Sequence, residues 1–95
     1  MTALLAARVV KACIDTGVTL ATAESLTAGL VAARIAEVPG CSAMLRGGVI
    51  AYATDVKARV LGLDQESLEQ VVSEAVASQL AQAATRVLRS DIGVG

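Results

Sequence analysis

Short apolar segments alternate with longer segments whose apolar residues recur at helical spacing, and this alternation restricts the fold more than any other feature of the sequence. Val18–Ala23 and Val49–Ala53 have the length and composition of buried strands, and Asp91–Gly95 has those of a strand beginning. Strands that are separated by helices usually form one layered sheet. The sequence therefore predicts an α/β domain with helix-sheet-helix layers and a largely buried sheet.

Capping residues and glycines mark the ends of the helices between these strands. Serine, threonine and aspartate side chains accept hydrogen bonds from free N–H groups at a helix start, and glycine often ends a helix. These signals predict four helices, which are Ala3–Thr16 ending at Gly17, Ser25 to the Pro39-Gly40 turn, Asp55–Gly62, and a last helix capped by Ser73. Asp64 is expected to cap one further turn before the last helix.

The chain contains no histidine, and this excludes several kinds of chemistry. Ser-His-Asp catalysis, Cys-His catalysis and His-ligated metal sites all require that residue. Cys13 and Cys41 form no CxxC pair, so we expect two reduced packing residues and no metal site. The net charge is -1 and Tyr52 is the one aromatic residue, so nucleic-acid binding lacks both its basic patch and its stacking surface.

Charged residues also argue against a membrane protein, although the mean hydropathy is +0.65. The longest stretch without a charge, Ala75 to Thr85, has 11 residues. A membrane-spanning helix needs about 20 apolar residues. Arg8, Lys11 and Asp15 interrupt the first apolar segment before it can form the core of a signal peptide. We therefore expect a cytoplasmic protein without a membrane segment.

Three short features contain the residues that are suited to catalysis. They are Ala23–Gly29 at a strand-to-helix junction, Gly47-Gly48 at the entry to a strand, and Tyr52 with Lys57 five residues later. A helix start rich in serine and threonine offers free backbone N–H groups to a phosphate or to a developing oxyanion. The alternative is that a serine or threonine of the first feature only caps the helix.

A nucleophilic Ser25 would need a lysine or a carboxylate as its base, because the chain has no histidine. Lys11 is expected on the exposed side of the first helix, whereas Lys57 follows a buried strand. Burial disfavours the ammonium form of a lysine, and a neutral amine can accept the proton of a serine. The alternatives are that Lys57 is an exposed helix residue beside Asp55 and that Tyr52 is a core aromatic.

Two other enzyme classes fit the sequence poorly. A dehydrogenase Tyr-Lys pair would have its lysine four residues after the tyrosine, but that position is Val56, and no GxGxxG loop is present. Glu24 and Asp55 are the acids adjacent to the candidate site, and nothing places them as an acid and base pair. We therefore exclude a dehydrogenase and do not favour a two-carboxylate hydrolase.

Several motifs occur in the order found in a known family. They are Thr22–Gly29, Val38–Ala43, Arg46–Tyr52, Lys57, Leu61-Gly62 and Val72–Glu74. They resemble the C-terminal domain family of competence/damage-inducible protein CinA. Members of that family include stand-alone amidohydrolases that convert nicotinamide mononucleotide to nicotinate mononucleotide and ammonia.

The resemblance implies roles for particular residues. Ser25 matches the nucleophile of the family, Lys57 its general base, and Tyr52 the hydroxyl that assists the proton transfer or orients the lysine. Three further positions match residues that shape the pocket for the nucleotide, namely Thr27, Gly29 and Gly48. No cofactor or metal is implied, and the partner is a small-molecule nucleotide.

The sequence departs from the family in three respects. Ala28 stands where the family usually has glycine, and Glu69–Val71 stands where the family usually has His-Gly-Ala. Family domains also continue beyond the position of Gly95 through further strands and helices. We therefore interpret residues 1–95 as a single domain that resembles the N-terminal portion of a larger one. Uncovered apolar surface would favour a homo-oligomer. The second functional hypothesis is a catalytically silent nucleotide-binding or interaction fragment of the same fold.

Overall fold

The computed structural model describes residues 1–64 and 73–95 of the chain. The helices and strands follow in the order α1 (Ala3–Thr16), β1 (Leu20–Glu24), α2 (Leu30–Ala36), the 3-10 helix η1 (Cys41–Ala43), β2 (Leu45–Ile50), α3 (Thr54–Leu61), α5 (Glu74–Leu88) and β3 (Ile92–Val94). The alternation of strands and helices predicted an α/β domain, and the structure confirms it.

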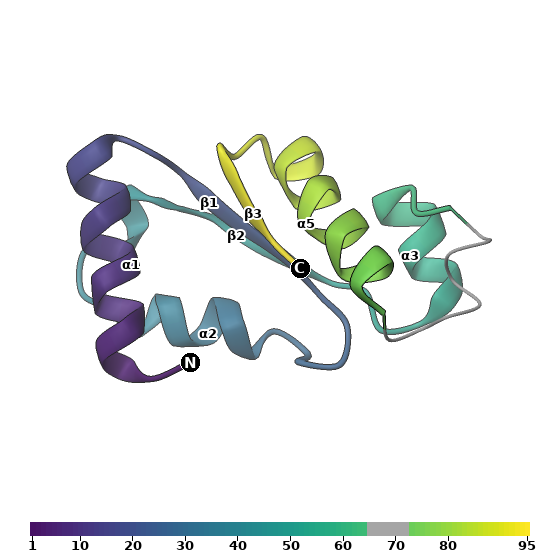
Figure 1. Ribbon diagram of the computed structural model, residues 1–95, viewed down its shortest axis with the longest axis horizontal. Coiled ribbons are helices and arrows are strands. Elements are labelled where there is room, and N and C mark those ends of the chain that lie inside the picture. Colours follow the sequence, from purple (N-terminus) through teal and green to yellow (C-terminus); the bar gives the residue numbers. More distant parts are fainter. Residues whose placement is uncertain (65–72) are drawn as a thin grey trace.

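The three strands form one parallel sheet in the order β2-β1-β3, so β1 is the central strand. Helices α1 and α2 lie on one side of the sheet, and α5 with α3 lies on the other (Figure 1). All five residues of β1 are buried, as expected for a strand covered on both faces. The predicted helix-sheet-helix layering is therefore correct.

Side chains on alternate faces of β1 enter two separate hydrophobic cores. Ala21 and Ala23 pack in a core with residues of α3 and α5, which include Leu61, Val76 and Leu80. Leu20 packs on the opposite face in a core whose other buried members are Val10, Cys13, Ile35 and Met44. Because side chains alternate along a strand, Thr22 and Glu24 lie on the same face as Leu20, toward α2.

The first helix begins and ends where the sequence predicts, and the last helix begins where it predicts. The Thr2 hydroxyl accepts a hydrogen bond of 3.1 Å from the backbone N–H of Leu5, and Gly17 ends α1 with a φ of 69°. The Ser73 hydroxyl accepts a 3.2 Å hydrogen bond from the N–H of Val76 and caps α5. Local capping chemistry is therefore sufficient to position these helix ends.

The predicted helix from Ser25 to Pro39 is wrong at both ends, because α2 runs only from Leu30 to Ala36. Residues 25–29 form a turn, in which Ala28 and Gly29 both have left-handed backbone conformations, with φ of 52° and 91°. Two consecutive left-handed residues cannot continue a right-handed helix. The β1–α2 connection is therefore longer than the sequence indicates.

The second strand and the third helix also differ from the prediction. Strand β2 occupies Leu45–Ile50, so Gly47-Gly48 lies within it and not before it. Helix α3 begins after Ala53, which has no side-chain cap, and Asp55 lies in its first turn. The prediction that Asp55 caps this helix is therefore wrong. The turn predicted after Asp64 falls on residues 65–72, outside the described residues.

Across residues 1–64 and 73–95, no helix has the length and apolar character of a membrane-spanning segment. In the same part of the chain, no group of three or more cysteine, aspartate or glutamate side chains is arranged to hold a metal ion.

Candidate functional site

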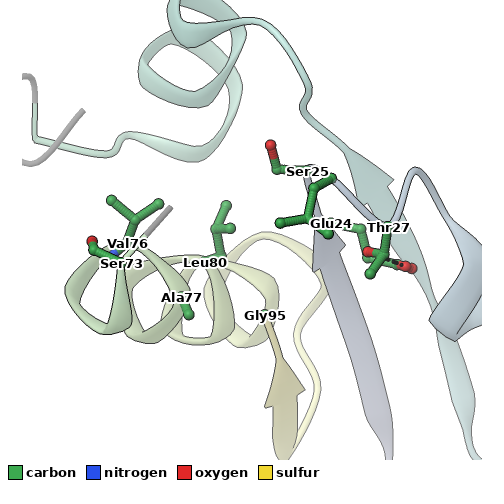
Figure 2. Close-up of a pocket in the computed structure, with 9 residues that line it drawn as sticks. Glu24, Ser25, Thr27, Ser73, Val76, Ala77, Leu80 and Gly95 are labelled. Carbon is green, nitrogen blue, oxygen red and sulfur yellow. Dashed lines mark hydrogen bonds between the residues drawn. The ribbon is translucent and has the colours of Figure 1, made fainter. Parts of the chain in front are cut away.

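An open cavity of about 180 Å³ lies at the carboxyl ends of the strands (Figure 2). Parallel α/β sheets usually bind their ligands at this edge. One wall follows β1, a second belongs to the first half of α5, and the end of β3 closes the space between them. The residues that line the cavity are Glu24, Ser25, Leu26, Thr27, Ser73, Val76, Ala77, Leu80 and Gly95.

Ser25 is half-buried and lies directly after the central strand. Its carbonyl oxygen accepts a 3.0 Å hydrogen bond from the N–H of Ala28, which closes the turn. Figure 2 shows its hydroxyl directed away from Ala77 and Gly95. Gly29 holds the N-cap position of α2, so the alternative that Ser25 or Thr27 caps this helix is wrong.

The side chain of Glu24 takes the part that a capping residue of α2 would normally have. It is 3% exposed and accepts hydrogen bonds from two backbone N–H groups of the first turn of α2, at 2.8 Å from Val31 and 3.1 Å from Ala32. The hydroxyls of Thr27 and Thr22 each donate a further hydrogen bond of 2.9 Å. Every donor that faces this carboxylate therefore belongs to β1, the turn or α2.

These contacts determine the ionisation of Glu24. Burial acts most strongly and by itself raises the pKa of the carboxyl group. The backbone N–H groups of Val31 and Ala32, together with the hydroxyls of Thr27 and Thr22, outweigh this effect and lower the pKa below its ordinary value. Glu24 is therefore an anion in a polar shell, which excludes it as a neutral general acid.

Lys57 lies on α3, which follows the neighbouring strand β2. It is fully buried, with 0% exposure, so the alternative of an exposed helix residue is wrong. Its Nζ atom has no hydrogen-bond partner within the described parts of the chain. Leu61 shares its face of the helix and packs with Val76 and Leu80 of the cavity wall. Lys57 is thus a buried residue of the helix that packs behind this wall, with no acceptor for its amine among the described residues.

Tyr52 lies between β2 and α3 and is 65% exposed, so the alternative of a core aromatic is also wrong. Tyr52 belongs to the described part of the chain, where the Nζ atom of Lys57 has no hydrogen-bond partner, so Tyr52 does not orient it by a hydrogen bond. Neither residue lines the cavity, whereas Ser25 and Thr27 do. The four residues share one edge of the sheet, because β1 and β2 run parallel with Glu24 opposite Ile50.

The two glycines assigned to the pocket each have a structural reason to be glycine. A Cβ atom on Gly29 would lie 2.7 Å from Cδ1 of Ile50, and the φ of Gly29 is left-handed. A Cβ atom on Gly48 would lie 2.3 Å from Oγ1 of Thr22. Both glycines therefore let β1, the turn and β2 approach one another, and neither is among the residues that line the cavity.

Comparison with known proteins matches this arrangement to one family. The model of the CinA C-terminal domain matches residues 2–95. The chain belongs to the CinA C-terminal domain family. A CinA-like protein of Frankia casuarinae is 46% identical over 80 residues, which are 84% of this chain and 18% of that protein.

Solved structures of CinA proteins have the same fold. A CinA superfamily protein from Klebsiella pneumoniae superposes with a TM-score of 0.91 at 32% identity, over 98% of this chain and 59% of that one. The competence/damage inducible protein CihA from Agrobacterium tumefaciens gives 0.85 at 35% identity, over 95% and 55%. The chain thus spans just over half of these structures and about a fifth of the curated relatives it matches.

The sequence analysis missed two parts of this CinA site. Glu24 was considered only as a catalytic acid, although threonines two residues before it and three residues after it indicate a local hydrogen-bonding role. The α5 wall, with Ser73, Val76 and Leu80, was interpreted only as a capped helix with an apolar stripe. No local signal could place that wall opposite Ser25, because the contact spans about fifty residues.

Proposed function

We propose that this CinA domain is an amidohydrolase that converts nicotinamide mononucleotide to nicotinate mononucleotide and ammonia. The observation that carries the proposal is that Lys57, on the helix after β2, is buried and its Nζ atom has no partner among residues 1–64 and 73–95. A buried polar group without a partner is costly to the fold, and such groups cluster at functional sites. We therefore assign the role of general base to Lys57.

The reaction proceeds in two steps. Lys57 takes the hydroxyl proton of Ser25 while Oγ attacks the amide carbonyl carbon, and the C–N bond then breaks as the lysine returns the proton to the leaving nitrogen, giving ammonia. Water next attacks the acyl-enzyme with the help of the same amine, which releases the carboxylate product and restores Ser25. Tyr52 assists the transfer of the proton, and Thr27, Gly29 and Gly48 shape the pocket.

Transfer of the proton requires Ser25 and Lys57 to come within reach of one hydrogen bond or one bridging water. In the structure Ser25 lines the cavity, and Lys57 is buried on the helix that follows the neighbouring strand, outside the cavity lining. We therefore propose that the amine and the hydroxyl approach each other when substrate is bound. Catalytic hydrogen bonds are often longer without a substrate and shorten in the complex.

A catalytically silent nucleotide-binding module is the second candidate. The absence of Lys57 and Tyr52 from the residues that line the cavity favours it. The two functions differ in one measurement, which is ammonia release from nicotinamide mononucleotide by the natural protein and by its Ser25→Ala variant. An amidohydrolase loses turnover in the variant and keeps its substrate affinity within a few-fold. If the Ser25→Ala variant still turns over substrate, Ser25 is not the nucleophile.

We also propose that the domain acts as a homo-oligomer in the cytoplasm. Leu30, Ile50 and Tyr52 are large side chains near the sheet edge that are more than half exposed. Apolar surface of this kind favours association between copies. Light scattering on the natural protein tests the proposal, and a monomer across the micromolar range would contradict it.

A further inference from the structure

We propose that Glu24 is a positioning residue, which holds the turn that carries Ser25 in a single conformation. The inference rests on the proposed function only in naming Ser25 as the group positioned. The structural claim concerns the turn itself. Loss of the Glu24 carboxylate is expected to release residues 25–32 while the rest of the domain stays folded.

The start of α2 has no other cap among the residues that the structure describes. The N-cap residue is Gly29, and no side chain of its own region caps the helix. The free N–H groups of Val31 and Ala32 instead reach the two carboxylate oxygens of Glu24, which lies seven and eight residues earlier. A buried N–H group without an acceptor is costly, so this carboxylate determines where a seven-residue helix begins.

The backbone of the turn contains a non-glycine residue in a left-handed conformation. Ala28 has a φ of 52° and is one of two non-glycine residues with positive φ within the described residues. A side chain in this conformation is unfavourable, so surrounding contacts must maintain it. Glu24 supplies contacts on both sides of Ala28, through the hydroxyl of Thr27 before it and the N–H groups of α2 after it. The carboxylate therefore clamps both ends of the strained segment.

The clamp is also anchored to the sheet. The carbonyl oxygen of Glu24 accepts a 2.8 Å hydrogen bond from the N–H of Ala51, which anchors it to the residue after β2. The hydroxyl of Thr22 binds the carboxylate from within β1. Ser25 thus directly follows Glu24, whose backbone belongs to the sheet and whose side chain holds the turn. Rigid elements of this kind position functional groups more precisely than free loops.

The Glu24 carboxylate also determines whether a ligand can bind at the start of α2. The N–H groups at the start of α2 that could hold a phosphate or an oxyanion already bind an anion that the protein itself provides. A negatively charged group of a substrate would be repelled by Glu24 at this helix end. We infer that Glu24 occupies the N–H groups at the start of α2, so the anion site that the sequence predicts there is not available to a ligand.

Backbone hydrogen exchange of the full chain, measured by NMR for the unmodified protein and for Glu24→Gln, tests the inference. The glutamine keeps the size of the side chain, but its NH2 group faces donors and cannot accept their hydrogen bonds. We expect amide exchange at Ala28, Leu30, Val31 and Ala32 to accelerate about tenfold or more, relative to the amides of α5. Equal acceleration in both regions would show a general loss of stability and overturn the inference, as would unchanged exchange.

Asp91→Asn is the matched control. This carboxylate also accepts hydrogen bonds from a threonine N–H and hydroxyl, both of Thr19, at 2.9 and 3.1 Å. It lies where β1 and β3 begin, at the end of the sheet opposite the cavity. We expect this variant to accelerate exchange around Thr19 and Ile92 and to leave the Ser25 turn unchanged. Acceleration in the turn would show that the effect is not specific to Glu24.

Thr27→Val decides the question if Glu24→Gln does not fold. It removes one of the four hydrogen bonds to the carboxylate and keeps the shape of the side chain. We expect the same amides to accelerate by a smaller factor, of about threefold to tenfold. If exchange in the turn does not accelerate relative to the rest of the protein, the clamp is contradicted.

A second measurement on the same variants tests the role of Glu24 separately from the proposed function. Covalent labelling of Ser25 by a serine-directed fluorophosphonate is followed by intact mass at a temperature where each variant is folded. Slower labelling in Glu24→Gln, with unchanged labelling in Asp91→Asn, supports positioning of the nucleophile. If the unmodified protein is not labelled at all, the nucleophile assignment fails, and the exchange data still decide the role of Glu24.

Discussion

The β1–α2 and β2–α3 junctions follow neighbouring parallel strands at the same edge of the sheet, and each removes one charged side chain from water. At the first junction, Glu24 is 3% exposed and accepts four hydrogen bonds. At the second, Lys57 is 0% exposed, and its Nζ atom has no partner among residues 1–64 and 73–95. The two side chains are thus buried to a similar extent, but Glu24 is fully hydrogen-bonded and Lys57 is not.

This difference supports the proposal that the Glu24 charge is structural and that Lys57 is functional. A buried ion whose hydrogen bonds are all satisfied stabilises the segment around it, and its loss leaves several donors unpaired. A buried amine without an acceptor lowers stability, so its presence needs another explanation. We interpret Glu24 as the residue that builds the turn and Lys57 as the residue that performs chemistry near it.

Lys57→Met should give the largest effect, with changes of opposite sign in activity and stability. Methionine fills a similar volume without a polar group, so the free energy of unfolding should rise by about 1–3 kcal/mol. Amidase turnover should fall by about a hundredfold or more, because the base is lost. Chemical denaturation and ammonia release measure the two effects.

Two variants sharpen this test of Lys57. Lys57→Arg keeps the charge but cannot deprotonate, so turnover should remain low while substrate affinity is largely kept. Lys11→Met removes an exposed lysine that pairs with Asp15, and stability should change by less than about 1 kcal/mol. A destabilised Lys57→Met protein would mean that the buried amine supports the fold, and an active arginine variant would end the Ser-Lys mechanism.

Gly48→Ala should disturb the Glu24 junction from the neighbouring strand. The new Cβ atom would lie 2.3 Å from Oγ1 of Thr22, the hydroxyl that donates to Glu24. We expect unfolding to become easier by about 1–3 kcal/mol, because backbone or side chain must shift. Gly17→Ala is the control, since a Cβ atom there meets nothing within 4 Å and only the left-handed backbone opposes it. Equal cost at both glycines would refute the close contact.

Stability at acidic pH should report the Glu24 junction separately. The pKa of Glu24 is lowered in the folded state, so its contribution is present above the unfolded value, near 4.5, and is lost as the pH falls through the lowered value. Hydrogen bonds from Thr19 lower the pKa of Asp91 in the same direction, so the whole protein should lose stability on acidification. Denaturation experiments between about pH 6 and pH 3 should show that the free energy of unfolding falls less steeply with pH in Glu24→Gln than in the unmodified protein. Parallel curves would contradict the lowered pKa.

Ala28→Gly should give the smallest effect and the only gain at the first junction. Glycine adopts a positive φ without steric cost, which is partly offset by its greater freedom in the unfolded chain. We expect a net stabilisation of about 0.5–1 kcal/mol by thermal unfolding. Arg89→Gly, at the matching φ of 53° where α5 ends, should stabilise similarly without changing exchange in the Ser25 turn. A destabilised Ala28→Gly protein would show that the methyl group packs favourably.

Sequence reasoning succeeded where a single residue determines the local structure. Thr2 and Gly17 delimit α1, and Ser73 begins α5, because capping involves groups only three or four residues apart. It failed at Ser25–Gly29, where serine and threonine next to an apolar stripe resemble a helix start. The left-handed backbone of Ala28 carries no sequence signal, since alanine is the strongest helix former.

The candidate site shows the same division. Ser25 and Lys57 could be selected from the sequence because the absence of histidine leaves few bases, and the resemblance to the CinA family gave them roles. The exposure of Tyr52, the burial of Lys57 and the α5 wall of the cavity depend on how α3 and α5 pack on the sheet. The carboxylate shell of Glu24 depends on α2 folding back over β1.

By itself, the sequence determined the α/β class, the two capped helices and a limited set of reactive side chains. Those properties follow from hydrophobic periodicity and from contacts within one helical turn. Only the tertiary structure decided that Glu24 is surrounded by donors and that the amine of Lys57 meets no acceptor in the part of the chain that the structure describes. Hydrogen bonding of a buried charge depends on atoms brought together from several segments, and no periodicity in the sequence records which donors will face it.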